Sequence, residues 1–217
     1  AAILSGTLVG VVNGLMVTRF YVNPLIATLG MLTIVRSLVL IVSGDRSMSS
    51  FPKAFQWIGQ GKIFSIPNPI WIFIILVIIA EIVLRRMKIG RLPFFVGSNA
   101  QAAELSGLRV KKIQFILYAL CGCAAGIAGV VSVARLNAAF PLAGNGAELR
   151  IIAAAVIGGC SLSGGQGSIV GALLGVILMA IINNLLILTG VPVYWQGLVA
   201  GLVLIVAVGF DEYSKRR

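Results

Sequence analysis

Long runs of apolar residues, almost free of charged side chains, dominate the sequence. The clearest of them cover residues 1–18, 21–43, 67–84, 113–134, 169–188 and 194–210. A helix that crosses the hydrocarbon core of a bilayer needs about 20 mainly apolar residues. Because lipid offers the backbone no hydrogen-bond partners, such a run must satisfy its amide groups internally, as a helix does. We therefore predict an all-α, polytopic helical membrane protein with about six or seven membrane segments.

The composition excludes the main alternatives to a membrane protein. Hydrophobic residues make up 59% of the chain and charged residues 11%, whereas soluble domains have about 45–50% apolar and about 25% charged residues. Disordered chains are poor in the residues that are abundant here. Histidine is absent, and Cys121, Cys123 and Cys160 lie inside apolar runs without the further ligands of a zinc pattern. We expect no catalytic site and no metal site.

Basic residues predict which loops face the cytoplasm. Residues 85–112 hold seven Lys or Arg side chains and a single acid, Glu104. Because Lys and Arg are enriched in cytoplasmic loops, this loop is placed inside, and the loops over 44–65 and 135–150 are placed outside. We attribute the net charge of +11 to basic residues that set the orientation of the chain in the membrane. It does not indicate nucleic-acid binding, because no basic stretch alternates with stacking aromatic residues.

The run over residues 151–160 is too short to span a bilayer as a regular helix. Even extended back to residue 147 it has about 14 residues, or about 21 Å, against about 30 Å of hydrocarbon. A short or broken helix that still crosses would place the tail at 215–217 inside, whereas a re-entrant segment would leave it outside. The basic residues of the tail favour the crossing.

Glycine spacing predicts close contacts between helices. In lipid, small residues four positions apart let helix backbones approach one another. This spacing occurs at Gly6/Gly10/Gly14, Gly122/Gly126, Gly167/Gly171/Gly175 and Gly197/Gly201. The sequence therefore predicts a tight helical bundle.

Few polar side chains lie inside the apolar runs. They are Asn13, Arg36, Glu81, Asn183 and Asn184. Glu81 precedes Arg85 by four residues, which predicts an ion pair at the interface. Arg36 either extends toward the surface or pairs with backbone carbonyls, or it lines a polar path, because an ionisable residue in a membrane is a functional hypothesis. The two late asparagines either bond between helices or line the same path.

The segment 97–107 has the pattern of a short capped helix. Ser98 or Asn99 can cap its start, and Gly107 suits its end. From the residues alone, this helix is either a docking site for a partner or an ordinary amphipathic loop helix.

A glycine-rich string follows the short run. Residues 162–166 read Leu-Ser-Gly-Gly-Gln, which is similar to the signature motif of ABC-transporter ATPases. The sequence has no phosphate-binding loop to accompany it. We therefore interpret the string as a tight glycine turn between closely packed helices.

Taken in order, these segments resemble one family. The matching strings are Asn23–Gly30, Gly97–Gly107 with Val110–Lys112, Tyr118–Gly122, Ala134–Leu136, Gly144–Leu149 and Gly158–Ser168. Together they are similar to the permease subunit of bacterial ribose-type sugar ABC importers, the class that carries ribose, xylose, galactofuranose and autoinducer-2. Permeases of that family are longer, so residues 1–217 are expected to form a single transmembrane permease domain that lacks its N-terminal part.

The resemblance implies how such a chain works. It pairs with a second permease copy or a paralogue in the bacterial inner membrane, surrounded by membrane lipid. A periplasmic sugar-binding protein delivers a monosaccharide, and a cytoplasmic ABC ATPase subunit drives the transport. ATP and Mg belong to that ATPase, so the chain itself is expected to hold no cofactor.

The resemblance also assigns the helix at 97–107 to ATPase coupling. The coupling surface comprises Gly97, Asn99, Ala102, Ala103, Ser106 and Gly107. Candidates for the translocation path are Arg36, Asn183 and Asn184. Candidates for contact with the binding protein are the outer-loop residues Arg135, Asn137 and Glu148, although Glu148 is also placed to cap the helix that follows.

Two other function classes make different demands on the sequence. A secondary, ion-coupled carrier requires acids at mid-membrane, and Glu81 is the single candidate for that role. An integral membrane enzyme requires a polar catalytic cluster, and the sequence shows none.

Overall fold

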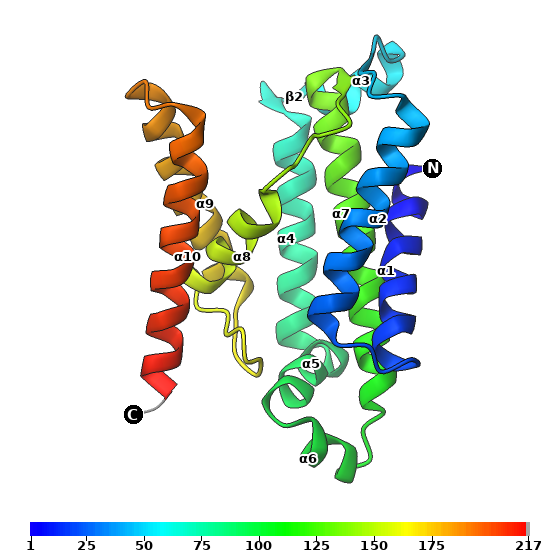
Figure 1. The fold of residues 1–217 in the computed structure, drawn as a ribbon, viewed down its shortest axis with the longest axis vertical. Helices are drawn as coiled ribbons and strands as arrows, with labels where there is room; N and C mark the ends of the chain where they lie inside the picture. The colour runs from blue at the N-terminus through cyan, green and yellow to red at the C-terminus, as the bar shows by residue number, and fades with distance from the viewer. Residues whose placement is uncertain (216–217) are drawn as a thin grey trace. The chain divides into compact units, whose positions relative to one another are not determined.

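The computed structural model describes the backbone of residues 1–215, and side chains through residue 209 apart from a few in the last helix. The chain divides into two compact units. Unit 1 comprises Ala1–Ile78 and Ser106–Ala143, and unit 2 comprises Ile79–Leu105 and the chain from Gly144 onward. In the described part of the chain ten of the fourteen elements are helices, and the four strands have two residues each (Figure 1), which confirms the predicted all-α membrane fold.

The main helices of unit 1 follow the apolar runs of the sequence. They are α1 (Ala2–Thr18), α2 (Pro24–Ser43), α7 (Val110–Leu136) and the first part of α4 (Asn68–Arg86), which ends in unit 2. Helix α2 begins where Asn23 Oδ1 accepts a hydrogen bond from Leu25 N at 2.9 Å, a cap that satisfies one unpaired amide. It ends at Gly44, whose φ of 57° is a conformation that glycine adopts without strain.

Glycines set the distance between α1 and α7. A Cβ added at Gly6 would lie 2.6 Å from the Gly122 carbonyl oxygen, and one added at Gly126 would lie 2.8 Å from Ile3 Cα. Backbones in such close contact leave no room for a side chain. Two of the predicted glycine patterns therefore meet in one interface.

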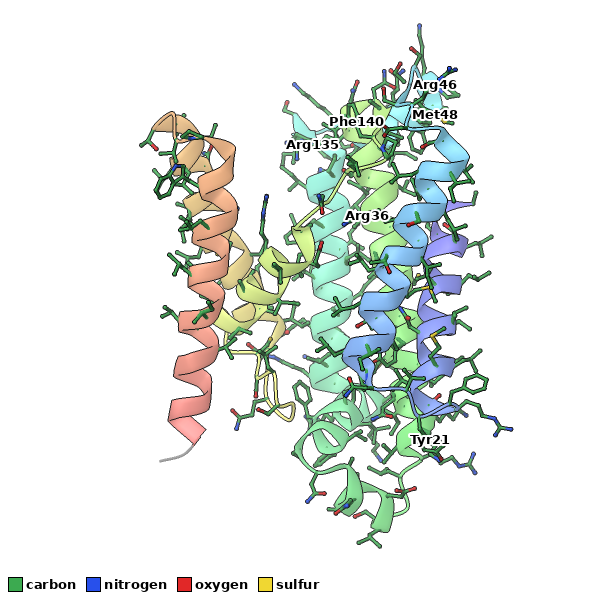
Figure 2. The ribbon with its side chains drawn as sticks, viewed as in Figure 1. Tyr21, Arg36, Arg46, Met48, Arg135 and Phe140 are labelled. Carbon is green, nitrogen blue, oxygen red and sulfur yellow. The ribbon has the colours of Figure 1, made fainter. Side chains whose placement is uncertain are left out.

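The loops at one end of unit 1 pair as short strands. β1 (Met48–Ser49) pairs antiparallel with β4 (Ala138–Ala139), and β2 (Lys62–Ile63) pairs with β3 (Ile66–Pro67). Figure 2 shows Met48 and Phe140 at this end and Tyr21 at the other. The loops after α2 and α7 thus share one side, as the predicted orientation requires.

A short helix that the sequence did not predict lies in the polar stretch after α2. This helix, α3 (Lys53–Gln60), contacts the end of α7, and a Cβ added at Gly59 would lie 2.6 Å from the Ala134 carbonyl oxygen. Gln60 Nε2 also donates a hydrogen bond to the Arg135 carbonyl oxygen at 3.1 Å. Both contacts depend on tertiary structure, which explains why local pattern did not reveal the helix.

Unit 2 holds the helices of the basic loop and those after the outer loop. They are α5 (Lys88–Ser98), α6 (Ala100–Leu105), α8 (Ala147–Ile157), α9 (Ile169–Leu188) and α10 (Val193–Lys215). Ala153, Ala154 and Met179 form a small core between α8 and α9. There a Cβ added at Gly175 would lie 2.9 Å from Gly158 N, which confirms a third glycine contact. Gly197 and Gly201 have no atom within 4 Å of such a Cβ among the described residues.

Helix lengths agree with the expected membrane segments. Within the described residues, α2, α4, α7 and α9 are long and apolar enough to cross a membrane, and α1 and the apolar part of α10 are shorter. Helix α8 has 11 residues, which confirms the expected short helix. The turn after α8 contacts Gly97 of the basic loop, so it lies on the side of that loop. Whether the segment crosses the membrane or is re-entrant stays a prediction, and the last two residues of the tail lie outside the described chain.

Candidate functional site

The segment 97–107 contains the capped helix that the sequence predicts. Asn99 Oδ1 accepts a hydrogen bond from Ala102 N at 2.9 Å, and α6 follows directly. Gly107 then has a φ of 83°, a left-handed conformation typical of the residue after a helix. Because Asn99 pairs one amide that a helix start leaves open, even so short a helix has a defined beginning.

The exposed side of α6 differs in part from the predicted coupling surface. Leu105 is 90% exposed, whereas Ala103 is 5% exposed. Leu105 is not part of the predicted surface. Of the residues that are part of it, the exposed ones are Asn99, Ala102, Ser106 and Gly107. Sequence reasoning missed Leu105 because a helix of six residues is too short for periodicity to show which side faces water. Burying such a leucine under a partner would contribute about 1.5–3 kcal/mol.

Gly97 belongs to α5 rather than to α6. A Cβ added at Gly97 would lie 2.7 Å from Gly165 N, and one added at Gly164 would lie 2.7 Å from the Gly97 carbonyl oxygen. The end of α5 therefore rests directly on the backbone of the turn between α8 and α9.

This turn is built from glycines in conformations that other residues avoid. Gly159, Gly164 and Gly165 have φ values of 83°, 88° and 80°. Ser161 N donates a hydrogen bond to the Gln166 carbonyl oxygen at 3.1 Å, which closes the turn. The Leu-Ser-Gly-Gly-Gln string is thus a compact turn between packed helices, as interpreted from the sequence.

Replacing Gly164 with alanine is expected to lower the free energy of unfolding more than replacing Gly159. Both positions share a left-handed φ, which costs an alanine roughly 1–2 kcal/mol. Only at Gly164 would the new Cβ meet α5, while at Gly159 nothing lies within 4 Å. The additional overpacking should cost about 1–3 kcal/mol. Denaturation of both purified variants in detergent measures the difference, and equal losses would mean that α5 does not rest on the turn.

Unit 1 contains a cavity between α1 and α2 in which three polar side chains lie among mainly apolar ones. Asn13, Thr28 and Arg36 line this cavity of about 370 Å³, together with Pro141 and Ala143 of the loop after β4. Asn13 Oδ1 is buried and has no hydrogen-bond partner among the described residues, which is costly unless a ligand or water meets it. Figure 2 shows Arg36 part-way along α2, between the two ends of the helix.

The remaining predicted path residues lie in the other unit. Asn183 is half-buried and Asn184 is exposed, both on α9 of unit 2. Arg36 shares its cavity with Asn13 and Thr28 instead. The sequence shows Asn13 and Arg36 as intramembrane polar residues. It does not show that α1 and α2 turn these two side chains toward the same cavity, which depends on how the helices pack.

The predicted outer-loop residues have different surroundings. Arg135 is exposed near the end of α7, and Asn137 follows that helix with a φ of 50°. Asn137 Oδ1 accepts a hydrogen bond from Phe51 N at 3.2 Å, so this side chain ties the two outer loops of unit 1 together. Glu148 lies in the first turn of α8 in unit 2, where a carboxylate complements the helix dipole.

Glu81 forms the ion pair with Arg85 that the sequence predicts. This pairing places its charge at the end of α4 near the basic loop, which is an unsuitable position for ion coupling at mid-membrane. Among the described residues, no group of three potential metal ligands lies together, and the cysteines are free thiols.

The chain matches known proteins over nearly its whole length. Residues 1–208 match the family model described as branched-chain amino acid transport system / permease component. The ribose import permease protein of Escherichia coli K12 is 40% identical over 216 residues, which cover 98% of this chain and 67% of that protein. The ribose import permease protein of Bacillus subtilis 168 is 37% identical over 202 residues, which cover 92% of this chain and 63% of that protein.

A third relative has a different named substrate. The L-arabinose ABC transporter permease protein of Azospirillum brasilense is 38% identical over 216 residues, which cover 99% of this chain and 63% of that protein. The chain spans about two thirds of the length of these relatives. No solved structure matches it. From the extent of these matches and from its membrane helices, the chain belongs to the branched-chain amino acid transport system / permease component family and is a multi-pass ABC-transporter permease of the inner membrane.

Proposed function

We propose that this permease carries a monosaccharide of the ribose or arabinose kind into the cell. The named substrates of its relatives support this substrate class. Its partners would be a cytoplasmic ABC ATPase, a periplasmic sugar-binding protein and a second permease copy or a paralogue. ATP and Mg would be bound by the ATPase, and this chain would bind no cofactor and perform no chemistry.

The observation that carries the proposal is the exposed leucine at the end of α6. A capped helix on the basic loop presents Leu105 at 90% exposure, and a partner that covered it would gain hydrophobic contact. In unit 2, α5 adjoins α6 and rests on the turn at Gly164. A displacement of α6 by the ATPase would therefore be passed through α5 to α8 and α9.

The cavity at Asn13 and Arg36 is the best-supported part of a sugar path. Its volume of about 370 Å³ falls in the range of small-molecule sites, about 300–1,000 Å³. Asn13 lines this cavity, and its Oδ1 is buried without a partner among the described residues, so a rotation of this side chain would let a sugar hydroxyl donate to it. The guanidinium of Arg36 offers several donors to sugar oxygens in the same cavity.

Replacing Asn13 with leucine is expected to reduce sugar uptake without destabilising the protein. The variant removes a buried acceptor without a partner, so the free energy of unfolding should stay the same or rise by up to about 1–3 kcal/mol. Loss of one hydrogen bond to the sugar should weaken its binding roughly fivefold. Asn68 provides the contrast, because its Oδ1 is likewise buried without a partner among the described residues while its Nδ2 donates to the Trp57 carbonyl oxygen at 2.7 Å. Asn68→Leu would lose that bond and should destabilise unit 1. Normal uptake in the Asn13 variant would remove this cavity from the path.

Uptake by reconstituted protein tests the function directly. The permease would be purified together with its ABC ATPase and placed in vesicles with the sugar-binding protein. We expect uptake of radiolabelled ribose or L-arabinose. This uptake should require ATP on the side of the vesicle membrane where the ATPase lies. Uptake driven by an ion gradient without ATP would contradict the proposal and favour a secondary carrier.

A further inference from the structure

Basic side chains surround a pocket at one end of unit 1. Arg19, Lys111 and Lys112 line it together with Tyr21, and its volume is about 470 Å³. These four residues define the basic end pocket. Positive-inside topology explains basic residues in this region, but it does not require that they converge on one concave site.

The packing of α1 on α7 builds the basic end pocket. Lys111 and Lys112 lie in the first turn of α7, and Arg19 follows the last residue of α1. A Cβ added at Gly14 would lie 3.0 Å from the Phe115 ring, which shows how closely the two helix ends approach. The pocket is therefore held by the same interface that joins the helices of unit 1.

Tyr21 lies beside one of these lysines. Its φ of 55° is unusual for a bulky residue. Lys111 Nζ lies 4.5 Å from the centroid of the Tyr21 ring and donates a hydrogen bond to Tyr21 Oη. A cation above an aromatic ring is attracted to it, so the pair holds both side chains at the edge of the pocket.

Unit 1 offers these cations no acidic counter-ion. The single carboxylate side chain in its residue ranges is Asp45, which follows α2 at the opposite end. Helix α7 begins without a side-chain cap, so its first amide groups add to the positive potential. An anion with several acceptor oxygens, such as a phosphate, would satisfy these cationic side chains.

The surroundings of the pocket favour a lipid over a soluble anion. The pocket lies at the cytoplasmic ends of two membrane helices, and Leu15 and Phe115 form part of its wall. Phe20 and Tyr21 are each 72% exposed, as is common for aromatic residues at headgroup level. A phospholipid presents a phosphate and apolar chains together, which matches a basic pocket with an apolar wall.

We propose that the basic end pocket binds the phosphate headgroup of an anionic phospholipid from the cytoplasmic leaflet. Arg19, Lys111 and Lys112 contact the phosphate oxygens, and Leu15 and Phe115 contact the acyl chains. The site depends on membrane orientation and on the contact between α1 and α7. It does not depend on which substrate the permease transports, so its test and that of the proposed function are independent.

The test compares lipid retention by two variants that lose the same charge. The complete protein would be placed in phosphatidylcholine nanodiscs containing phosphatidylglycerol, and bound lipid counted by native mass spectrometry. One variant carries Arg19→Gln, Lys111→Gln and Lys112→Gln. The control carries Arg46→Gln, Lys53→Gln and Lys62→Gln, at exposed positions of the outer loops. Since each cation near the surface contributes roughly fivefold in affinity, we expect retention to fall at least tenfold in the first variant alone.

Several outcomes would overturn the proposal. Unchanged retention in the first variant, or an equal loss in both, would show that the pocket is not a specific site. Displacement of the lipid by inorganic phosphate at equal concentration would show that the pocket binds a free anion instead. Should the triple variant fold poorly, Lys112→Gln alone, at an exposed position, gives the same comparison with an expected loss of roughly fivefold.

Discussion

Replacing Gly122 with leucine is expected to reduce the yield of folded protein at least tenfold. A Cβ at this position would lie 2.9 Å from Gly10 Cα and 3.0 Å from Gly10 N, so even the first atom of the side chain meets backbone. Overpacking of a close contact costs about 1–3 kcal/mol and occasionally more, and 1.4 kcal/mol is a tenfold change in an equilibrium constant. Backbone cannot rotate away as a side chain does, so the cost should lie at the upper end of that range.

The matched control for this change lies on the same helix. Gly129 is also a helical glycine of α7, but nothing lies within 4 Å of a Cβ added there among the described residues. Gly129→Leu should therefore leave the yield and the thermal midpoint of the detergent-purified protein nearly unchanged. Equal behaviour of Gly122→Leu and Gly129→Leu would mean that α1 does not pack on α7 through its glycines.

The long helices could be predicted because lipid imposes a simple rule. Helix α9 occupies Ile169–Leu188, the same residues as the apolar run, since an uncharged stretch of about 20 residues has one stable state in a bilayer. Local chemistry similarly marks helix starts. Ser168 Oγ accepts a hydrogen bond from Gly171 N at 2.9 Å, and such caps can be read from residue type alone.

Helix α5 could not be predicted in the same way. Its sequence contains Gly90, Pro93 and Gly97, and these residues argue against a helix. The structure explains the glycines by close contact rather than by flexibility. A Cβ added at Gly90 would lie 2.8 Å from Leu84 Cα, so α5 folds tightly against the end of α4.

The candidate site shows the same division between local and long-range information. The cap at Asn99 and the turn at Gly164 follow from residue types and short spacings. The inward position of Ala103 and the cavity shared by Asn13 and Arg36 depend on how helices rotate against their neighbours. A sequence shows which polar residues enter the membrane, but their grouping requires the packed structure.

Replacing Leu105 with aspartate is expected to weaken binding of the ATPase at least tenfold. The side chain is 90% exposed, so the permease itself loses little packing. A complex that buries this position would lose about 1.5–3 kcal/mol of hydrophobic contact and would have to desolvate a carboxylate as well. The measurement is the amount of ATPase that co-purifies with the complete permease, together with sugar-stimulated ATP hydrolysis.

Phe64 supplies the matched control for Leu105, because it is 89% exposed and lies in the outer loop between β2 and β3. Phe64→Asp should leave ATPase co-purification unchanged, since Phe64 lies in a loop that the distribution of basic residues predicts to face outside. Ala103→Asp separates docking from folding, because Ala103 is 5% exposed and a buried charge should lower stability as well as ATPase binding. If Leu105→Asp retains full ATPase binding while Ala103→Asp loses both, α6 supports the fold of unit 2 and the ATPase docks elsewhere. Selective loss in Leu105→Asp would instead place the coupling contact on the exposed side of α6, from which α5 leads to the glycine turn.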